Sequence, residues 1–384
     1  MKKIRYGIVG LGNMGTGHAQ IIMRGETPEI EITAIADRRA DRREWAEQNL
    51  PDTVKIFTEG EELIESGLCD AVHICTPHYQ HPELSIKAFE NNLHVMCEKP
   101  AGVYTQQVRE MNEAADKYGK VFAMMFNQRT NCLYRKMHEM ITSGEMGEIK
   151  RVNWIITDWY RTQIYYDSGD WRATWNGEGG GVLLNQCPHN LDLIQWICGM
   201  PKTVQAFCHE GKWHDIEVED DVTAYLEYPN GATGAFITST GDAPGTNRFE
   251  VTTEMGKLVC ENGKLMLYKL GINEREYCKT ATEGFVPPPC EVVEVETDGE
   301  NFQHMAVMNA FAANILHGTK LVADGREGIN GLALSNAMHL SSWLKKPVEI
   351  PVSEELFKAE LDKRRKNSKV KTTESITFTT EGSY

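Results

Sequence analysis

The feature that most constrains this chain is a glycine-rich loop between two short apolar segments near its N-terminus. A strand pattern over Ile4–Val9 runs directly into G-x-G-x-x-G at residues 10–15, and a helical pattern follows. In this setting Gly10 permits the tight turn, Gly12 lets the backbone approach a pyrophosphate, and Gly15 lets the helix pack closely on the strand. The free N–H groups and dipole at the helix N-terminus favour an anion. The context therefore predicts a dinucleotide-binding unit over a plain glycine-rich turn.

The residue that ends the second strand bears on which dinucleotide binds. That strand, Ile30–Ala36, is followed by Asp37, about twenty residues past the loop. A carboxylate there accepts hydrogen bonds from a free ribose 2′-OH and repels a 2′-phosphate, which favours NAD over NADP. Arg38 and Arg39 follow, and an arginine near this position can accommodate the phosphate. Their alternative roles are exposure to solvent or stacking of Arg38 on adenine.

Composition excludes several classes of partner. The 384 residues carry 40 basic and 55 acidic side chains, a formal charge of −15, which argues against nucleic acid or an anionic membrane as the main partner. No apolar run approaches the roughly 20 residues of a membrane span. Because the first strand pattern begins within a few residues of Met1, we expect no signal peptide. The ten cysteines form no C-x-x-C pair and fit reduced thiols, so we expect a cytoplasmic protein.

The order of strand and helix patterns divides the chain. Residues 1–126 alternate strand and helix and predict an α/β fold, a doubly wound Rossmann domain with a parallel sheet. Residues 127–351 contain successive hairpin patterns and predict an α+β domain with a large, open, mainly antiparallel sheet, for substrate binding and oligomerisation. Residues 352–384 are charged and then threonine-rich, which fits either an arm reaching a neighbouring subunit or a loose end.

Ligands of a parallel sheet lie at the carboxyl ends of its strands, and several motif residues fall there. One of them, Lys99, follows an apolar strand and precedes a proline, which holds it at the cofactor cleft, although a lysine at a strand end is most often simply solvated. A nearby nicotinamide would make its ammonium easier to deprotonate. A second cluster begins with three glycines at 179–181 and leads to His189 and Asp192, which are three residues apart on one helix face. A lone histidine at a helix start is more often structural than catalytic.

An aromatic stretch precedes these glycines. Four of the eight tryptophans lie between residues 154 and 175, with interleaved tyrosine, arginine and aspartate. Flat rings beside polar groups suit a pyranose, whereas a sheet or subunit interface also favours aromatics. We expect substrate contact from Tyr165, Trp171 and Arg172. His209 and His214 have a spacing that fits no helix face in a strand-like region, so we expect no metal site.

These motifs together resemble the glucose-fructose oxidoreductase / inositol dehydrogenase / rhizopine-catabolism (Gfo/Idh/MocA) family from Lys3 to about Pro351. The resemblance implies a tightly held nicotinamide cofactor, a carbohydrate-like substrate, and a C-terminal sheet that forms dimers or tetramers. It also implies that Lys99 positions the reacting hydroxyl, that the bond before Pro100 is often cis, and that His189 is the acid/base. The cofactor-binding positions that follow are Gly10, Gly12, Asn13, Met14, Gly15, Asp37, Arg38, Thr76, Pro77, His81, Glu98, Lys99 and Asn127.

One position departs from the family pattern. Many members have an aspartate four residues before the histidine, and this chain has Asn185. An amide can orient a sugar hydroxyl but cannot accept its proton. The proton would therefore rest on His189, with Asp192 as a candidate for orienting it, or pass through Lys99. The substitution also fits a distinct substrate subgroup.

We therefore expect an NAD-dependent enzyme that transfers a hydride between the nicotinamide and a secondary hydroxyl of a sugar, inositol or glycoside. In this reading His189 moves the proton and Lys99 stabilises the alkoxide, while substrate contacts come from Lys99, Tyr165, Trp171, Arg172, Asn185 and His189. One alternative is an enzyme that retains its NAD and oxidises the substrate transiently, for glycoside cleavage or epimerisation. Another is a non-catalytic dinucleotide sensor.

Overall fold

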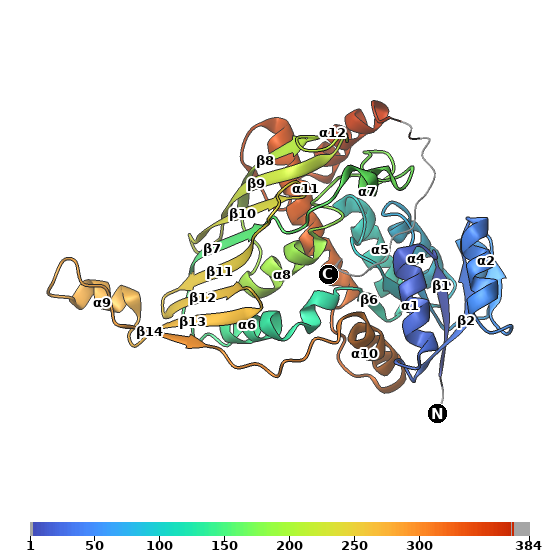
Figure 1. Ribbon diagram of the computed structural model, residues 1–384, viewed down its shortest axis with the longest axis horizontal. Helices are drawn as coiled ribbons and strands as arrows, with labels where there is room; N and C mark the ends of the chain where they lie inside the picture. Colours follow the sequence, from blue (N-terminus) through green and yellow to red (C-terminus); the bar gives the residue numbers. More distant parts are fainter. Residues whose placement is uncertain (1–2, 370, 372–384) are drawn as a thin grey trace.

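A computed structural model describes residues 3–369 and 371. Two sheets organise the chain, and they lie at opposite sides of the molecule in Figure 1. The first is parallel and six-stranded, in the order β3-β2-β1-β4-β5-β6. Its elements are β1 (Ile4–Val9), α1 (Asn13–Met23), β2 (Ile30–Ala36), α2 (Ala40–Asn49), β3 (Lys55–Phe57), α3 (Gly60–Glu65), β4 (Ala71–Ile74), α4 (Gln80–Glu90), β5 (His94–Cys97), α5 (Thr105–Tyr118) and β6 (Phe122–Met124). This is the predicted Rossmann domain.

The second sheet has nine strands in the order β14-β13-β12-β11-β7-β10-β9-β8-β15. Its pairs are antiparallel except for β7 with β10, which confirms the predicted open, mainly antiparallel sheet. Its strands are β7 (Ile149–Ile156), β8 (Thr203–Glu210), β9 (Glu219–Glu227), β10 (Thr233–Ser239), β11 (Asn247–Thr253), β12 (Gly256–Glu261), β13 (Lys264–Leu270), β14 (Cys290–Glu294) and β15 (Val348–Glu349).

Helices cover one face of this sheet and connect it to the Rossmann domain (Figure 1). The helices that follow β6 in the chain are η1 (Asn127–Thr130), α6 (Cys132–Thr142), α7 (Gln163–Asp167), α8 (Pro188–Cys198), α9 (Glu274–Thr280), α10 (Gln303–His317), η2 (Gly325–Glu327), α11 (Gly328–Leu344) and α12 (Glu354–Lys366). Along β9, Val222, Ala224 and Leu226 are buried while Tyr225 and Glu227 are exposed. This period-two alternation is typical of a sheet with one covered and one open face. Within the described residues no helix is both long and apolar enough to cross a membrane.

Two C-terminal segments lie where the sequence did not place them. Helix α10 belongs by sequence to the second domain, yet Val307, Met308 and Phe311 pack into the core that includes β1 and β2. The segment expected to be an arm or a loose end contains α12, which buries Phe357 and Leu361 against its own chain. The apolar pair at positions i and i+4 explains why this charged segment docks as a helix. The Thr-rich residues from 372 onward lie outside the described residues.

Candidate active site

The glycine loop has the geometry that a dinucleotide requires. Gly10 has φ +95°, and a Cβ there would lie 2.7 Å from the Cys75 carbonyl oxygen. A Cβ on Gly15 would lie 1.9 Å from the Gly10 carbonyl oxygen, whereas a Cβ on Gly12 would meet no atom within 4 Å. The chain itself therefore requires two of the glycines, and the third borders open space. Helix α1 begins there with Asn13 and Met14 and has no side-chain cap, so its N-terminus can receive a pyrophosphate.

Asp37 lies beside this loop, as predicted for the residue that ends β2. Its carboxylate oxygens accept hydrogen bonds from the backbone N–H of Leu11 at 2.6 Å and of Arg39 at 2.8 Å. The Arg38 guanidinium is 2.7 Å from a carboxylate oxygen of Glu59. The carboxylate is thus held at the edge of the loop, and the neighbouring arginine already has an anionic partner.

The loops after β4 and β5 are tied together. His81 bonds the carbonyl oxygens of Thr76, at 2.6 Å, and Pro100, at 2.7 Å. The Thr76 hydroxyl and the Asn127 side-chain oxygen are buried, and neither has a hydrogen-bond partner among residues 3–369 and 371. Pro77 follows Thr76 in the same loop. Unsatisfied polar atoms at the carboxyl ends of the strands fit a cofactor that brings its own donors and acceptors.

Glu98, one of the predicted cofactor-binding residues, has a buried histidine as its partner. Its side chain lies 2.7 Å from His18 Nε2, and both residues are buried. Burial alone would raise the pKa of Glu98, but the hydrogen bond and charge of His18 outweigh it and hold the pKa below its usual value. His73 and Cys75 complete a buried group whose candidate ligand atoms lie within 4.8 Å of one another. Sequence analysis missed this group, although His18 follows Gly15 by one turn of α1.

Lys99 extends from the end of β5 into the space between the two domains. Its ammonium donates to the backbone carbonyl of Asn185 at 2.9 Å, and the Lys99–Pro100 bond is cis, as the family resemblance implied. Burial lowers the pKa of Lys99; Glu98 opposes this shift, and the positive charge of Arg172 adds to it. The lysine is therefore held at the domain junction in a state that releases a proton more readily than a solvated lysine.

His189 is the second residue of α8, after Pro188. Its Nδ1 atom has no hydrogen-bond partner within the described part of the chain, and its ring meets Phe126 edge-on at 6.3 Å. Burial, followed by the charge of Lys99, lowers the pKa of His189 well below its usual value. The imidazole is therefore neutral near pH 7 and competent to accept a proton.

The structure does not pair Asp192 with His189. Both Asp192 oxygens instead accept hydrogen bonds from Arg129 of η1, at 2.6 and 2.7 Å. A buried guanidinium is the stronger partner for a buried carboxylate because it can donate two parallel hydrogen bonds. Asp192 therefore does not orient His189, as sequence analysis had suggested. It instead connects α8 to η1 through Arg129.

The predicted substrate residues converge on one side chain. Asn185 Oδ1 accepts a hydrogen bond from the Tyr165 hydroxyl at 3.2 Å, and Arg172 donates to that same hydroxyl at 2.9 Å. The Arg172 guanidinium also lies 4.6 Å from the centre of the Trp171 ring. Other members of the aromatic stretch are buried elsewhere: Trp154 stacks on Phe249 at 4.1 Å. The stretch thus divides between the sheet core and the wall of the candidate site.

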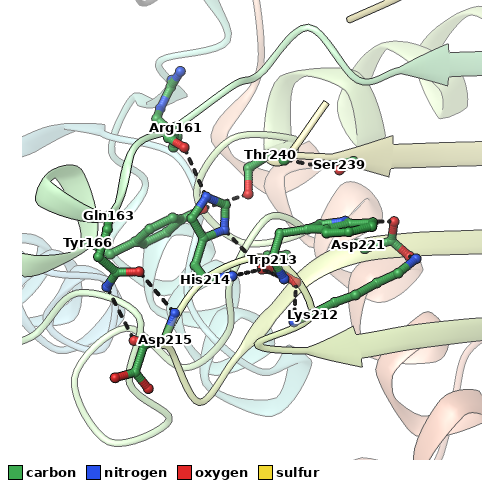
Figure 2. Close-up of polar contacts among 12 residues, drawn as sticks. Arg161, Gln163, Tyr166, Lys212, Trp213, His214, Asp215, Asp221, Ser239 and Thr240 are labelled. Carbon is green, nitrogen blue, oxygen red and sulfur yellow. Dashed lines mark hydrogen bonds and ion pairs between the residues drawn. The ribbon is translucent and has the colours of Figure 1, made fainter. Parts of the chain in front are cut away.

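The loop between β8 and β9 is hydrogen-bonded to the segment that contains Arg161 and Gln163, as Figure 2 shows. The His214 ring bonds an Asp220 carboxylate oxygen and the carbonyl oxygen of Arg161, both at 2.9 Å. Gln163, at the start of α7, exchanges hydrogen bonds with the backbone of Asp215. His209 pairs separately with Asp221 at 2.8 Å. The two histidines that sequence analysis considered for a metal therefore contact different aspartates, and the contact of His214 with Arg161 fixes the segment carrying Tyr165.

Sequence analysis also missed Glu178. This residue is buried, and its carboxylate accepts hydrogen bonds from the Asn185 side-chain amide and, at 2.6 Å, from the Ala173 backbone N–H. Burial raises the pKa of Glu178, and Arg172 opposes that shift. Its one sequence signal is its position immediately before the triple glycine, which says little without the fold.

The parallel sheet, the glycine loop and the uncapped N-terminus of α1 define residues 4–126 as a dinucleotide-binding Rossmann domain. Two family models match the chain: the "Oxidoreductase family, NAD-binding Rossmann fold" over residues 4–126 and the "GFO/IDH/MocA C-terminal domain" over residues 134–259. The chain belongs to the Gfo/Idh/MocA family of oxidoreductases.

Individual relatives are more distant. The D-glucoside 3-dehydrogenase of Escherichia coli K12 is 28% identical over 246 residues, covering 59% of this chain and 68% of that protein. The myo-inositol 2-dehydrogenase of Thermotoga maritima is 26% identical, covering 67% and 75%. Among solved structures, the WlbA dehydrogenase from Chromobacterium violaceum, in complex with NADH and UDP-GlcNAcA, has a TM-score of 0.79 at 25% identity, covering 92% of this chain and 97% of that one. Levoglucosan dehydrogenase with NADH and levoglucosan, at 19% identity and a TM-score of 0.75, shares the fold over 91% of this chain and 100% of its own.

Proposed function

We propose that this protein transfers a hydride between NAD and a secondary hydroxyl of a sugar, inositol or glycoside. The observation that carries this proposal is that Lys99, at the end of β5 in the Rossmann sheet, reaches across to the second domain, with its ammonium 2.9 Å from the Asn185 carbonyl oxygen and close enough to His189 for its charge to lower the pKa of that ring. The cofactor would be held by the glycine loop, Asp37 and the loops after β4 and β5, and it supplies the hydride acceptor. The related dehydrogenases named for a glucoside and an inositol support the substrate class.

The side chains divide the remaining work. A neutral His189 accepts the hydroxyl proton, and Lys99 stabilises the negative charge that develops on the oxygen. Tyr165, Arg172 and Trp171 form a wall with aromatic faces and polar edges, which suits a polyhydroxylated ring. Holding the carbon in place next to the cofactor supplies a large part of the rate acceleration.

NAD is the proposed cofactor in preference to NADP. A 2′-phosphate would meet the Asp37 carboxylate, and Arg38 is already paired with Glu59. Arg39 is likewise paired, with Asp41 at 2.6 Å, so the two arginines next to Asp37 already have carboxylate partners, which favours a free 2′-OH over a 2′-phosphate.

We also propose that two or more copies associate through the open face of the nine-stranded sheet. Phe207 of β8 and Tyr225 of β9 are 59% and 46% exposed on neighbouring strands of that face. Large exposed aromatics on a flat sheet favour burial against a second surface.

Absorbance at 340 nm with purified protein and NAD⁺ tests the activity, with inositols, free hexoses and glycosides as substrates. We expect steady NADH production that falls at least about 10²-fold in Lys99→Ala while NAD⁺ binding is retained. NADP⁺ in place of NAD⁺ serves as the cofactor control. Substrate consumed without net NADH would indicate transient oxidation with retained cofactor. NAD⁺ binding without turnover of any of these substrates would contradict the proposal and favour a sensor.

A further inference from the structure

Asn185 is the residue on which the polar contacts of the candidate site meet. Its backbone carbonyl accepts from Lys99, its side-chain oxygen accepts from Tyr165, and its amide nitrogen donates to Glu178. A carboxylate can only accept, so Glu178 dictates that the amide nitrogen of Asn185 faces it and that the amide oxygen faces Tyr165. The orientation of the Asn185 side-chain amide is thus set by the Glu178 carboxylate.

Glu178 is well placed to hold that orientation. Its side chain is buried, and its two oxygens are used by different partners, Asn185 and the Ala173 backbone N–H. Its own carbonyl oxygen bonds His78 Nδ1 at 3.1 Å, which fixes the backbone on which the carboxylate stands. A carboxylate held at both oxygens and at its main chain cannot turn away from the site without breaking several hydrogen bonds.

The charge of Glu178 matters because the site is otherwise rich in cations. Lys99 and Arg172 lie on the substrate side, and the Arg161 guanidinium lies 5.2 Å from the centre of the Tyr165 ring. Burial lowers the pKa of Lys99, while the negative charges of Glu98 and Glu178 raise it. Glu98 is engaged by His18 inside the Rossmann domain, whereas Glu178 contacts the substrate wall itself.

We propose that Glu178 is a positioning residue of the substrate pocket. Its hydrogen bond fixes the orientation of the Asn185 amide, and its negative charge balances the positive charges of Lys99 and Arg172. This role rests on the proposed function for its catalytic meaning. This role explains why the site can have an asparagine at position 185 where many family members have an aspartate. The carboxylate is provided by Glu178, which is hydrogen-bonded to the Asn185 amide.

Three variants test the proposal. Glu178→Gln removes the charge and keeps the size of the side chain. The double variant Glu178→Gln/Asn185→Asp restores one carboxylate at the neighbouring position. Glu217→Gln is the matched control, because Glu217 is a carboxylate that instead bonds the Trp175 backbone N–H. Thermal unfolding and NAD⁺ binding establish that each variant is folded.

The first readout needs no turnover. The rate at which acetic anhydride acylates Lys99, followed by peptide mass spectrometry across pH, reports the fraction of free amine. We expect the midpoint in Glu178→Gln to move to lower pH by at least about half a unit, which is about a threefold change in that fraction, and to move back in the double variant. Coincident curves for Glu178→Gln and wild type, or an equal shift in Glu217→Gln, would overturn the proposal.

The second readout is turnover of the substrate found for the wild-type protein. We expect kcat to fall at least about tenfold in Glu178→Gln, with NAD⁺ affinity unchanged and the pH–rate profile displaced toward acid, and to recover in the double variant. A double variant no better than Glu178→Gln would refute the charge role. If the wild-type protein turns over no hydroxyl substrate, while Glu178→Gln still shifts the acylation midpoint of Lys99, the proposed function is refuted and the charge balance is established.

Discussion

At the residue scale, the surroundings of His189 decide what its imidazole can do. The ring is half-buried beside Lys99, and both effects disfavour a second proton. A histidine at this position would be an ordinary helix-start residue if it faced water. Between the two domains, the imidazole stays uncharged at neutral pH, which is the state that the proposed role as a base requires.

We predict a pH dependence of kcat/KM that reflects this environment. Because the pKa of His189 is lowered, protonation removes the base only as pH falls well below the usual value of about 6.5. The acid limb of the profile should therefore lie well below pH 6.5, and activity at pH 6.5 should remain close to that at pH 7. Initial rates from pH 4.5 to 9 measure this. A limb centred at pH 6.5 or above would show a solvated histidine.

At the element scale, the glycines of the loop meet two different requirements: close packing of the chain itself, and space for the cofactor. The chain needs Gly15 because α1 passes against the Gly10 carbonyl, whereas Gly12 touches nothing of the chain. We predict that Gly12→Ala unfolds at nearly the wild-type temperature but binds NAD⁺ at least about tenfold more weakly. Gly15→Ala should lose about 2 kcal/mol or more of unfolding free energy. Differential scanning fluorimetry and NAD⁺ titration separate the two, and equal loss of stability in both variants would contradict this division.

The loop between β8 and β9 should set substrate affinity through α7. Asp220 accepts hydrogen bonds from the backbone N–H groups of Lys212, Trp213 and His214 and from the His214 ring. We predict that Asp220→Asn, which turns one acceptor into a donor, lowers the unfolding free energy by about 2 kcal/mol and raises KM for the substrate, with NAD⁺ affinity unchanged. Asp221→Asn, on the more exposed neighbour, serves as the control and should change KM little. A KM unaffected by Asp220→Asn would limit the loop to a structural role.

Sequence reasoning worked for elements whose causes are local. The apolar segments of β1 and β2 and the glycine spacing between them each specify structure over fewer than ten residues, and each was predicted from the sequence. It did not work where distant residues decide. Glu178 gains its role from Asn185 through a fold-dependent contact, and Asp192 lost its expected role because η1 delivers Arg129. The segment that contains α12 was predicted to be an arm or a loose end, because two apolar residues among many charged ones are a weak signal for a packed helix.

At the scale of the whole molecule, buried histidines should make stability depend on pH. Burial lowers the pKa of His73 and His78 well below the usual value and that of His304 to about 3. The unfolded chain therefore binds protons below pH 6.5 that the native state resists, and stability falls as pH falls. The lowered pKa of Glu98 acts in the same direction, since its contribution is lost when the carboxylate protonates.

We predict that the free energy of unfolding is nearly constant from pH 8 to 7 and falls steadily below pH 6.5. Each unit of pKa difference contributes about 1.4 kcal/mol. Urea unfolding at pH 7, 6 and 5 measures the slope. His304→Asn should flatten it, because one of the shifted groups is then absent, whereas a wild-type free energy that does not change between pH 7 and 5 would mean that these rings are protonated in the native state.

The return of α10 to the Rossmann core has a consequence for how the chain is made. Phe311 lies against Tyr6 with ring centres 6.4 Å apart, so the first strand to leave the ribosome is covered by a helix synthesised some three hundred residues later. Until then the core around β1 contains α1 and β2 but lacks α10, and a nascent chain halted before residue 303 leaves that part of the core exposed to other chains. Synthesis of the N-terminal domain thus ends long before its folding does.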